Sequence, residues 1–171
     1  MASGKLFCWA RAEVMARASR QLKDRYGFFA YVYAALRTGV MPPLHRYRIV
    51  ADGRELKVKA AMVLLANMGQ FVTKTIPPMQ VTVAPDVSYQ DGRLDVCIFA
   101  PRSVRDVAAL LWRVTSRRFR GDPRFTYFQA AEIFVQADPP VFTEMDGEPL
   151  GHTPLSARAV PGGVSVLVPR V

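Results

Sequence analysis

The sequence predicts an α+β fold that is mainly β: an antiparallel β-sandwich with two N-terminal helices and one inserted helix. In several short runs, apolar residues alternate with charged ones, which is the period of a half-buried strand. Asp-Gly steps at 52–53, 91–92 and 146–147 supply tight turns next to such runs. Helical spacing is confined to residues 12–37 and 103–115, which argues against the β-helix-β alternation of a doubly wound parallel sheet.

The helical segments can be placed by their apolar spacing and their ends. The first lies after residue 12 and is interrupted at Gly27, and a second apolar helix is expected over residues 28–36. Ser103 is a suitable N-cap for the inserted helix, which runs to Thr115. The apolar stripe of that helix consists of Val104, Val107, Ala108 and Leu111.

The strand segments begin with a hairpin around Asp52-Gly53. Tyr47 and Ile49 alternate with arginines before this turn, and Leu56 and Val58 alternate with lysines after it. The second strand is expected to continue through residues 60–66, which are apolar at every position and therefore buried. Further strands are expected at 81–83, 94–98, 125–136, 141–144, 155–160 and 164–168, the last two joined by Pro161-Gly162-Gly163.

The charge balance allows several kinds of partner. The 171 residues suit one domain, and the formal net charge of +9 is compatible with nucleic acid, an anionic membrane or a phosphorylated small molecule. The arginines and lysines are spread over the helices and form no compact run of the kind found in nucleic-acid-binding arms. A solvated helix face explains them equally well.

The cysteines, histidines and glycines exclude several chemistries. Cys8 and Cys97 form no CxxC pair and no metal-ligand spacing with His45 or His152, which favours reduced cysteines and a cytoplasmic location. No GxGxxG or GxxxxGK[ST] motif is available to hold nucleotide phosphates. No apolar run reaches the roughly 18 residues that span a bilayer, so membrane contact is expected to be peripheral.

Two Asp-Gly turns belong to longer motifs. The first runs from Ala84-Pro85 to Asp91-Gly92-Arg93-Leu94-Asp95-Val96, and the second is Asp146-Gly147-Glu148. In order and spacing, together with the terminal 160–169 segment, they resemble the C-terminal half of bacterial diacylglycerol kinases and YegS-like lipid kinases. Gly27 to Tyr31 and the asparagine Asn67 also resemble family positions. The resemblance covers roughly residues 12 to 169, so we expect a domain at 12–171 and an unmatched segment at 1–11.

The chain also departs from this family. The Gly-rich step that opens the family's domain is replaced here by residues 7–12, Phe-Cys-Trp-Ala-Arg-Ala. The Gly-Gly-Asp-Gly-Thr motif of the ATP-binding domain would precede residue 1. The resemblance therefore implies the C-terminal domain of a lipid kinase without its ATP-binding domain, as a fragment, a split gene product or a degenerate relative. Such a chain is expected to be inactive alone.

The resemblance also implies roles for individual residues. Glu148 corresponds to the general base that accepts the proton of the lipid hydroxyl, and Asp146 would hold its turn. A magnesium ion would be held by Ser88, Asp91 and the main-chain carbonyl of Arg93, with water completing its shell. ATP would be the co-substrate, bound by the domain that this chain lacks.

Two functions remain open at this point. The first is the lipid-side domain of a kinase that phosphorylates a diacylglycerol-like hydroxyl, with peripheral contact to an anionic membrane. The second is a non-catalytic basic β domain that binds lipid, a membrane surface or a protein partner. In both cases we expect no nucleic-acid partner. Self-association, for example as a homodimer, is expected because the face toward the absent ATP-binding domain should be apolar.

Overall fold

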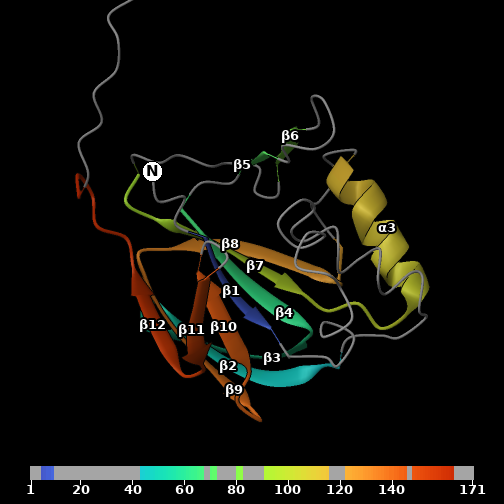
Figure 1. Cartoon of the computed structure of the whole chain (residues 1–171), viewed down its shortest axis with the longest axis horizontal. Coiled ribbons are helices and arrows are strands. Elements are labelled where there is room, and N and C mark those ends of the chain that lie inside the picture. Colours follow the sequence, from blue (N-terminus) through green and yellow to red (C-terminus); the bar gives the residue numbers. More distant parts are fainter. Residues whose placement is uncertain are drawn as a thin grey trace, which may run out of the picture.

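A computed structural model describes residues 5–9, 43–67, 70–72, 80–82, 91–115, 122–145 and 148–163. In this part of the chain every paired strand is antiparallel, and one helix is present (Figure 1). The predicted class, mainly β and antiparallel, is confirmed. The two predicted N-terminal helices lie outside the described residues.

The strands form two main sheets and one small one. The six-stranded sheet has the order β11 (Glu148–His152), β10 (Phe142–Met145), β1 (Lys5–Trp9), β4 (Met62–Ala66), β7 (Leu94–Phe99) and β8 (Phe125–Ala130). The four-stranded sheet has the order β12 (Leu155–Arg158), β9 (Glu132–Asp138), β2 (His45–Ala51) and β3 (Arg54–Ala60). The short strands β5 (Gln70–Val72) and β6 (Gln80–Thr82) pair with each other.

The core lies between the two main sheets, as in a sandwich. Alternate residues of β2 and β9, such as Tyr47, Ile49 and Val135, are buried in one cluster with Val96 and Ile98 of β7. In Figure 1, β2, β3 and β9 of the four-stranded sheet lie below β4, β7 and β8 of the six-stranded one. Because β4 and β7 are buried along their whole length, the six-stranded sheet is covered on both faces there, which explains their unbroken apolar sequence.

Two predicted long strands are each divided in the structure. The strand predicted through 60–66 breaks at Ala61, where the chain leaves the four-stranded sheet for the six-stranded one. The strand predicted over 125–136 breaks at Ala131 and crosses in the opposite direction. Both predictions of a single strand were wrong, because an apolar or alternating run can continue across a corner at which the chain changes sheet.

The corner at Ala131 is fixed by a side chain from the predicted Asp52-Gly53 turn. That turn is confirmed: it joins β2 to β3, and both of its residues have positive φ, 47° for Asp52 and 80° for Gly53. The Asp52 carboxylate also accepts hydrogen bonds from the backbone N–H groups of Ala131 and Glu132, at 3.0 Å each. The turn therefore has a second role, which is to hold the β8–β9 corner against the end of the β2–β3 hairpin.

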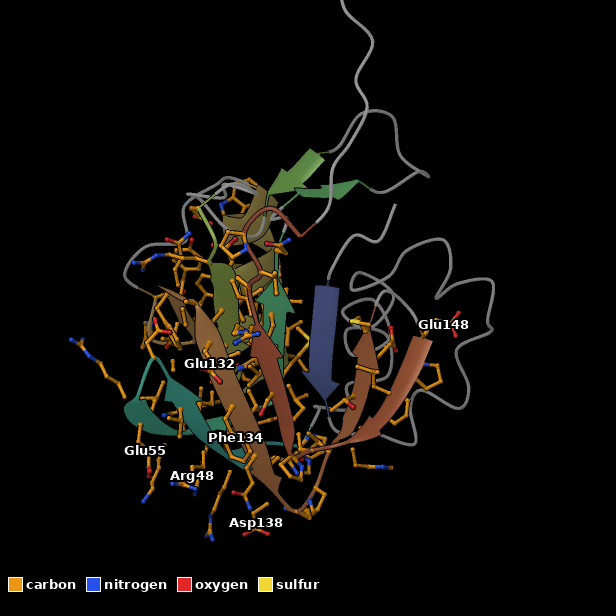
Figure 2. All side chains as sticks on the ribbon, turned by 90° about the vertical axis from the view of Figure 1, so that its left-hand side faces the viewer. Arg48, Glu55, Glu132, Phe134, Asp138 and Glu148 are labelled. Carbon is orange, nitrogen blue, oxygen red and sulfur yellow. The ribbon has the colours of Figure 1, made fainter. Side chains whose placement is uncertain are left out.

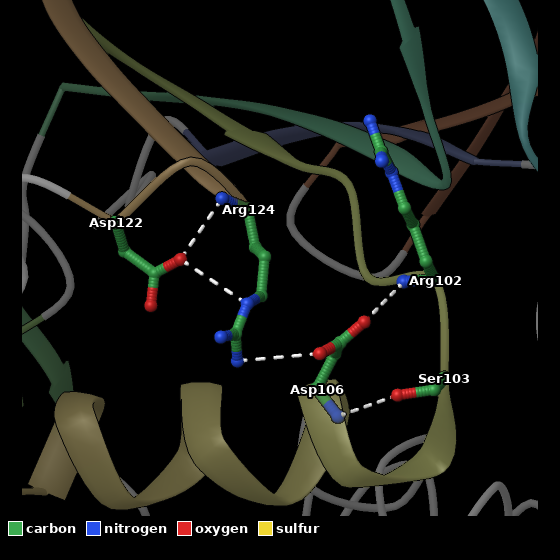
Figure 3. A network of polar contacts seen from close by, with 5 residues as sticks. All are labelled: Arg102, Ser103, Asp106, Asp122 and Arg124. Carbon is green, nitrogen blue, oxygen red and sulfur yellow. Dashed lines mark hydrogen bonds and ion pairs between the residues drawn. The ribbon is translucent and has the colours of Figure 1, made fainter.

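The inserted helix is confirmed as α3 (Val104–Thr115), with Ser103 as its N-cap. The Ser103 hydroxyl accepts a hydrogen bond from the N–H of Asp106 at 3.2 Å. The Asp106 carboxylate accepts from the N–H of Arg102 at 2.8 Å and pairs with the Arg124 guanidinium at 3.3 Å (Figure 3). Arg124 also lies 3.4 Å from Asp122, so this network ties the start of the helix to the start of β8.

Some strands were not predicted from the sequence. β1 lies in the segment 1–11 that the motif comparison left unmatched, yet it occupies the middle of the six-stranded sheet between β10 and β4. β11 (Glu148–His152) follows the predicted Asp146-Gly147 turn, but no strand was predicted there. The predicted strand at 164–168 lies outside the described residues.

Candidate active site

Glu148 opens β11, the edge strand of the six-stranded sheet, and its side chain is exposed. Figure 2 shows it at the periphery of the molecule, away from the labelled residues of the four-stranded sheet. The apolar side chains of Met145 and Leu150 nearby in the hairpin are 46% and 55% exposed. A carboxylate in this position can be reached by a substrate, as general-base chemistry requires. Asp146 lies outside the described residues.

The strand registers show which other residues lie at the same end of the sheet as Glu148. Pairing across the sheet connects Glu148 in turn with Met145, Leu6, Leu65 and Val96. Asn67, which follows β4, and Asp91, which precedes β7, therefore lie at the same end of the sheet as Glu148. Four strand spacings separate β11 from β7, which is about 19 Å at the usual distance between strands. The fold gathers the motif residues at one end of the sheet without bringing Glu148 and Asp91 into contact.

Asp91 and Gly92 form the tight turn that enters β7. The Asp91 carboxylate accepts a hydrogen bond from the N–H of Arg93 at 3.0 Å, and Gly92 has a φ of 66°. A Cβ atom on Gly92 would lie only 2.7 Å from Cγ of Pro161, so glycine is required there by contact as well as by φ. Two motifs that are 70 residues apart in the sequence thus pack on each other.

A buried carboxylate that the sequence analysis did not single out lies next to this turn. Asp95 is 2% exposed and accepts hydrogen bonds from the Tyr127 hydroxyl at 2.6 Å and from the Gln129 amide at 3.1 Å. The same Gln129 amide nitrogen is 3.5 Å from the second carboxylate oxygen of Asp91. The signal in the sequence was an acidic residue inside an otherwise apolar strand, which requires hydrogen-bonding partners from a neighbouring strand.

The Asp91 turn can hold a hard cation only with a large share of water ligands. Its described donors are one exposed carboxylate and main-chain carbonyls such as that of Arg93, while Asp95 is already engaged by two donors. Among the described residues, no three His, Cys, Asp or Glu side chains gather as a metal site. Ser88 lies outside the described residues. This donor set fits the few protein ligands and several waters that are usual for magnesium.

Cys97 is a free, buried cysteine of β7. Burial raises the pKa of the Cys97 thiol, so this cysteine is an inert part of the core. None of the described helices is both long and apolar enough to cross a bilayer.

The comparisons with known proteins identify the family of this chain. The family described as YegS C-terminal NAD kinase beta sandwich-like domain matches residues 9–168, and the chain belongs to this family. Relatives include a Staphylococcus aureus protein named "Putative lipid kinase", which is 24% identical over 146 residues, 85% of this chain and 46% of the relative. The protein sll0036 of Synechocystis is 25% identical over 164 residues, 92% of this chain and 36% of its own length.

Solved structures share the fold. A crystal structure of "a putative diacylglycerol kinase" from Bacillus anthracis superposes with a TM-score of 0.73 at 19% identity, over 94% of this chain and 50% of the other. A second structure, of a diacylglycerol kinase from the same organism, gives a TM-score of 0.64 at 17% identity. The chain thus spans about half the length of these proteins or less, and the family model identifies it as a YegS-type C-terminal domain, as the motifs indicated.

Proposed function

We propose that this chain is the lipid-side domain of an ATP-dependent lipid kinase that phosphorylates a diacylglycerol-like hydroxyl. The observation that carries the proposal is the exposed Glu148 at the sheet end where the family motifs gather. The lipid hydroxyl oxygen attacks the γ-phosphorus of ATP, the bond from that phosphorus to the bridging oxygen breaks, and ADP leaves. Glu148 accepts the hydroxyl proton during the attack.

The roles of the remaining residues are those that the family resemblance implies. Asp146 stands two residues before Glu148 and would hold its turn. A cation at Asp91 supplies positive charge to a loop, and with Ser88 and the Arg93 carbonyl it would order the turn that enters β7. Since about 19 Å separates β7 from β11, such a cation would order the loop and would not act on the proton that Glu148 accepts.

Activity requires an ATP-binding domain, because none of the motifs that hold nucleotide phosphates occurs in these 171 residues. The purified chain is expected to transfer no radiolabelled phosphate from ATP to lipid in mixed micelles. Joined to the ATP-binding half of the Bacillus anthracis relative, it is expected to gain activity. Transfer by the chain alone would contradict this part of the proposal.

The decisive variant is Glu148→Gln in that chimera. Loss of a general base lowers turnover by roughly 10²-fold or more, while lipid binding changes little. Glu132→Gln is the matched control, because Glu132 is an exposed carboxylate on the four-stranded sheet. Asp91→Ala should lower activity and be partly restored by high magnesium. If Glu148→Gln kept full turnover, Glu148 would be a turn residue only and a non-catalytic lipid-binding domain would be the better description.

A further inference from the structure

The outer face of the four-stranded sheet carries a cluster of basic side chains at one end. The alternation of β2 turns Tyr47 and Ile49 into the core, so Arg46 and Arg48 point outward. On β3 the exposed residues Lys57 and Lys59 lie on this same outer face, because they pair with the two arginines. Four cations from two neighbouring strands therefore lie side by side.

The register makes this arrangement unfavourable for the sheet itself. Arg46 lies directly opposite Lys59, and Arg48 lies directly opposite Lys57. Like charges in directly opposed positions of an antiparallel pair repel and destabilise the pair. Two such pairs in succession indicate a site for an external anion, since its charge would relieve the repulsion.

The four cations differ in whether a carboxylate lies close enough to neutralise their charge. Glu55 accepts two hydrogen bonds from the Arg48 guanidinium, at 3.0 and 3.1 Å, and lies 3.1 Å from the Lys57 ammonium group. Among the residues that the structure describes, no carboxylate lies within ion-pair distance of Arg46 or Lys59. The end of the cluster formed by Arg46 and Lys59 is therefore the part with charge available for a ligand.

These side chains line a groove of about 420 Å³, to which β9 contributes Gln136 and Asp138. This volume is within the range of small-molecule sites, roughly 300–1,000 Å³. The guanidinium forks match phosphate oxygens in geometry, and a phosphate monoester carries close to two negative charges at neutral pH. We propose that this groove binds a phosphate monoester group, presented either on a lipid headgroup or on a soluble molecule.

The acidic neighbours favour a single phosphate group over a nucleic acid. Asp138 lies opposite Arg46 across β2 and β9, and Glu55 and Glu132 are exposed on the outer face as well (Figure 2). A nucleic-acid strand needs a continuous basic track with many phosphate contacts, and these carboxylates would repel it. A single phosphate group needs only the end of the groove formed by Arg46 and Lys59, where none of the described carboxylates is within ion-pair distance.

The groove is separate from the candidate active site. Figure 2 shows Arg48, Glu55 and Asp138 together on one side of the molecule and Glu148 on another. The two sites also lie on different sheets. The proposed phosphate site therefore uses none of the residues assigned to catalysis, and it stands whether or not the chain serves a lipid kinase.

Binding to the 171-residue chain tests this site directly. The probes are phosphatidylcholine vesicles containing phosphatidate, vesicles containing phosphatidylglycerol at matched surface charge, and inorganic phosphate measured by calorimetry. The variant Arg46→Gln/Lys59→Gln removes the two cations that lack a described counterion. We expect it to weaken binding about tenfold or more, since each basic residue near an anionic surface contributes roughly fivefold. Asp138→Asn removes the carboxylate from the groove and should strengthen binding.

The control is Arg102→Gln/Arg105→Gln, which removes the same charge from exposed positions beside and on α3. If only the groove variant loses phosphatidate binding, and inorganic phosphate does not compete with that binding, the ligand is a lipid headgroup. Inorganic phosphate binding that only the groove variant loses supports a soluble phosphate ester. The proposal would be overturned if both double variants lost the same amount of binding, or if phosphatidylglycerol vesicles bound as well as phosphatidate vesicles. It would also be overturned if duplex DNA were bound in preference to both kinds of vesicle and to inorganic phosphate. If the groove variant does not fold, Asp138→Asn decides, and unchanged binding then refutes the site.

Discussion

The two main sheets differ in how their strands are buried. In the six-stranded sheet, β4 and β7 are buried at every position, and their two faces are both apolar apart from Asp95. In the four-stranded sheet, β9 alternates strictly between buried and accessible residues, and its outer face is charged. The six-stranded sheet, the inner sheet of the two, is buried on both faces at β4 and β7, whereas the four-stranded sheet gives one face to the same core and its outer face to solvent. Mutations in the two sheets should therefore differ in kind.

The largest expected effect is a cavity in the inner sheet. Ile98→Ala removes a side chain that is 1% exposed and belongs to the core between the sheets. We expect a loss of about 2–5 kcal/mol in the free energy of unfolding, measured by chemical denaturation. Val50→Ala on the outer face of β2 is the control and should cost less than about 1 kcal/mol. Equal losses would show that the outer face is packed as tightly as the core.

A smaller effect is expected at the connection between the sheets. Asp52→Ala removes the acceptor for the N–H groups of Ala131 and Glu132, where the chain crosses from one sheet to the other. Because these bonds are charge-assisted but lie near solvent, we expect a loss of about 1–2 kcal/mol in the free energy of unfolding. Asp52→Asn keeps an acceptor oxygen and tolerates the positive φ, so its loss should be smaller. If neither variant lost stability, the carboxylate would not be the group that holds this corner.

The sequence was sufficient for the elements whose signals are local. The Asp52-Gly53 hairpin follows from turn chemistry, and the N-cap of α3 follows from Ser103. It was insufficient where the structure depends on distant partners. The breaks at Ala61 and Ala131 occur inside continuous apolar or alternating runs, and only the hydrogen bonds of another segment reveal them.

The candidate site shows the same division. The ordered motifs pointed to Glu148 and Asp91, but the partners of Asp95 could not be found by spacing. Tyr127 and Gln129 are more than 30 residues away in sequence and meet Asp95 only through the β7–β8 register. The basic cluster is different, because the predicted Asp52-Gly53 hairpin already sets the arginines of β2 opposite the lysines of β3. Only the contribution of β9 to the groove needed the structure.

The smallest expected effect concerns two partly exposed carboxylates, Asp106 at the start of α3 and Glu55 on the outer face of the four-stranded sheet. The Arg102 N–H, which donates to Asp106, is the main reason that the pKa of this carboxyl lies below its ordinary value of 3.8. Its carboxylate therefore stabilises the folded protein fully above pH 3.8, and the contribution is lost as the pH falls through the lowered pKa. The hydrogen bond from Arg48 is likewise the main reason that the pKa of Glu55 lies below its ordinary value of 4.5. The sign of the pH dependence is thus the same for both residues.

The two carboxylates should differ in their response to salt. The Asp106 side chain is 20% exposed and is bonded to the backbone at the start of α3, whereas the Glu55 side chain is 38% exposed and is bonded to two flexible cations. Asp106→Asn should lower the thermal midpoint at neutral pH and flatten its fall in acid, at low and at high salt. Glu55→Gln should change the midpoint less, and only at low salt, because exposed pairs are screened. Thermal melts at several pH values and two ionic strengths measure both variants. If Glu55→Gln lowered the thermal midpoint more than Asp106→Asn at high salt, the outer face of the four-stranded sheet would contribute to stability as the inner sheet does.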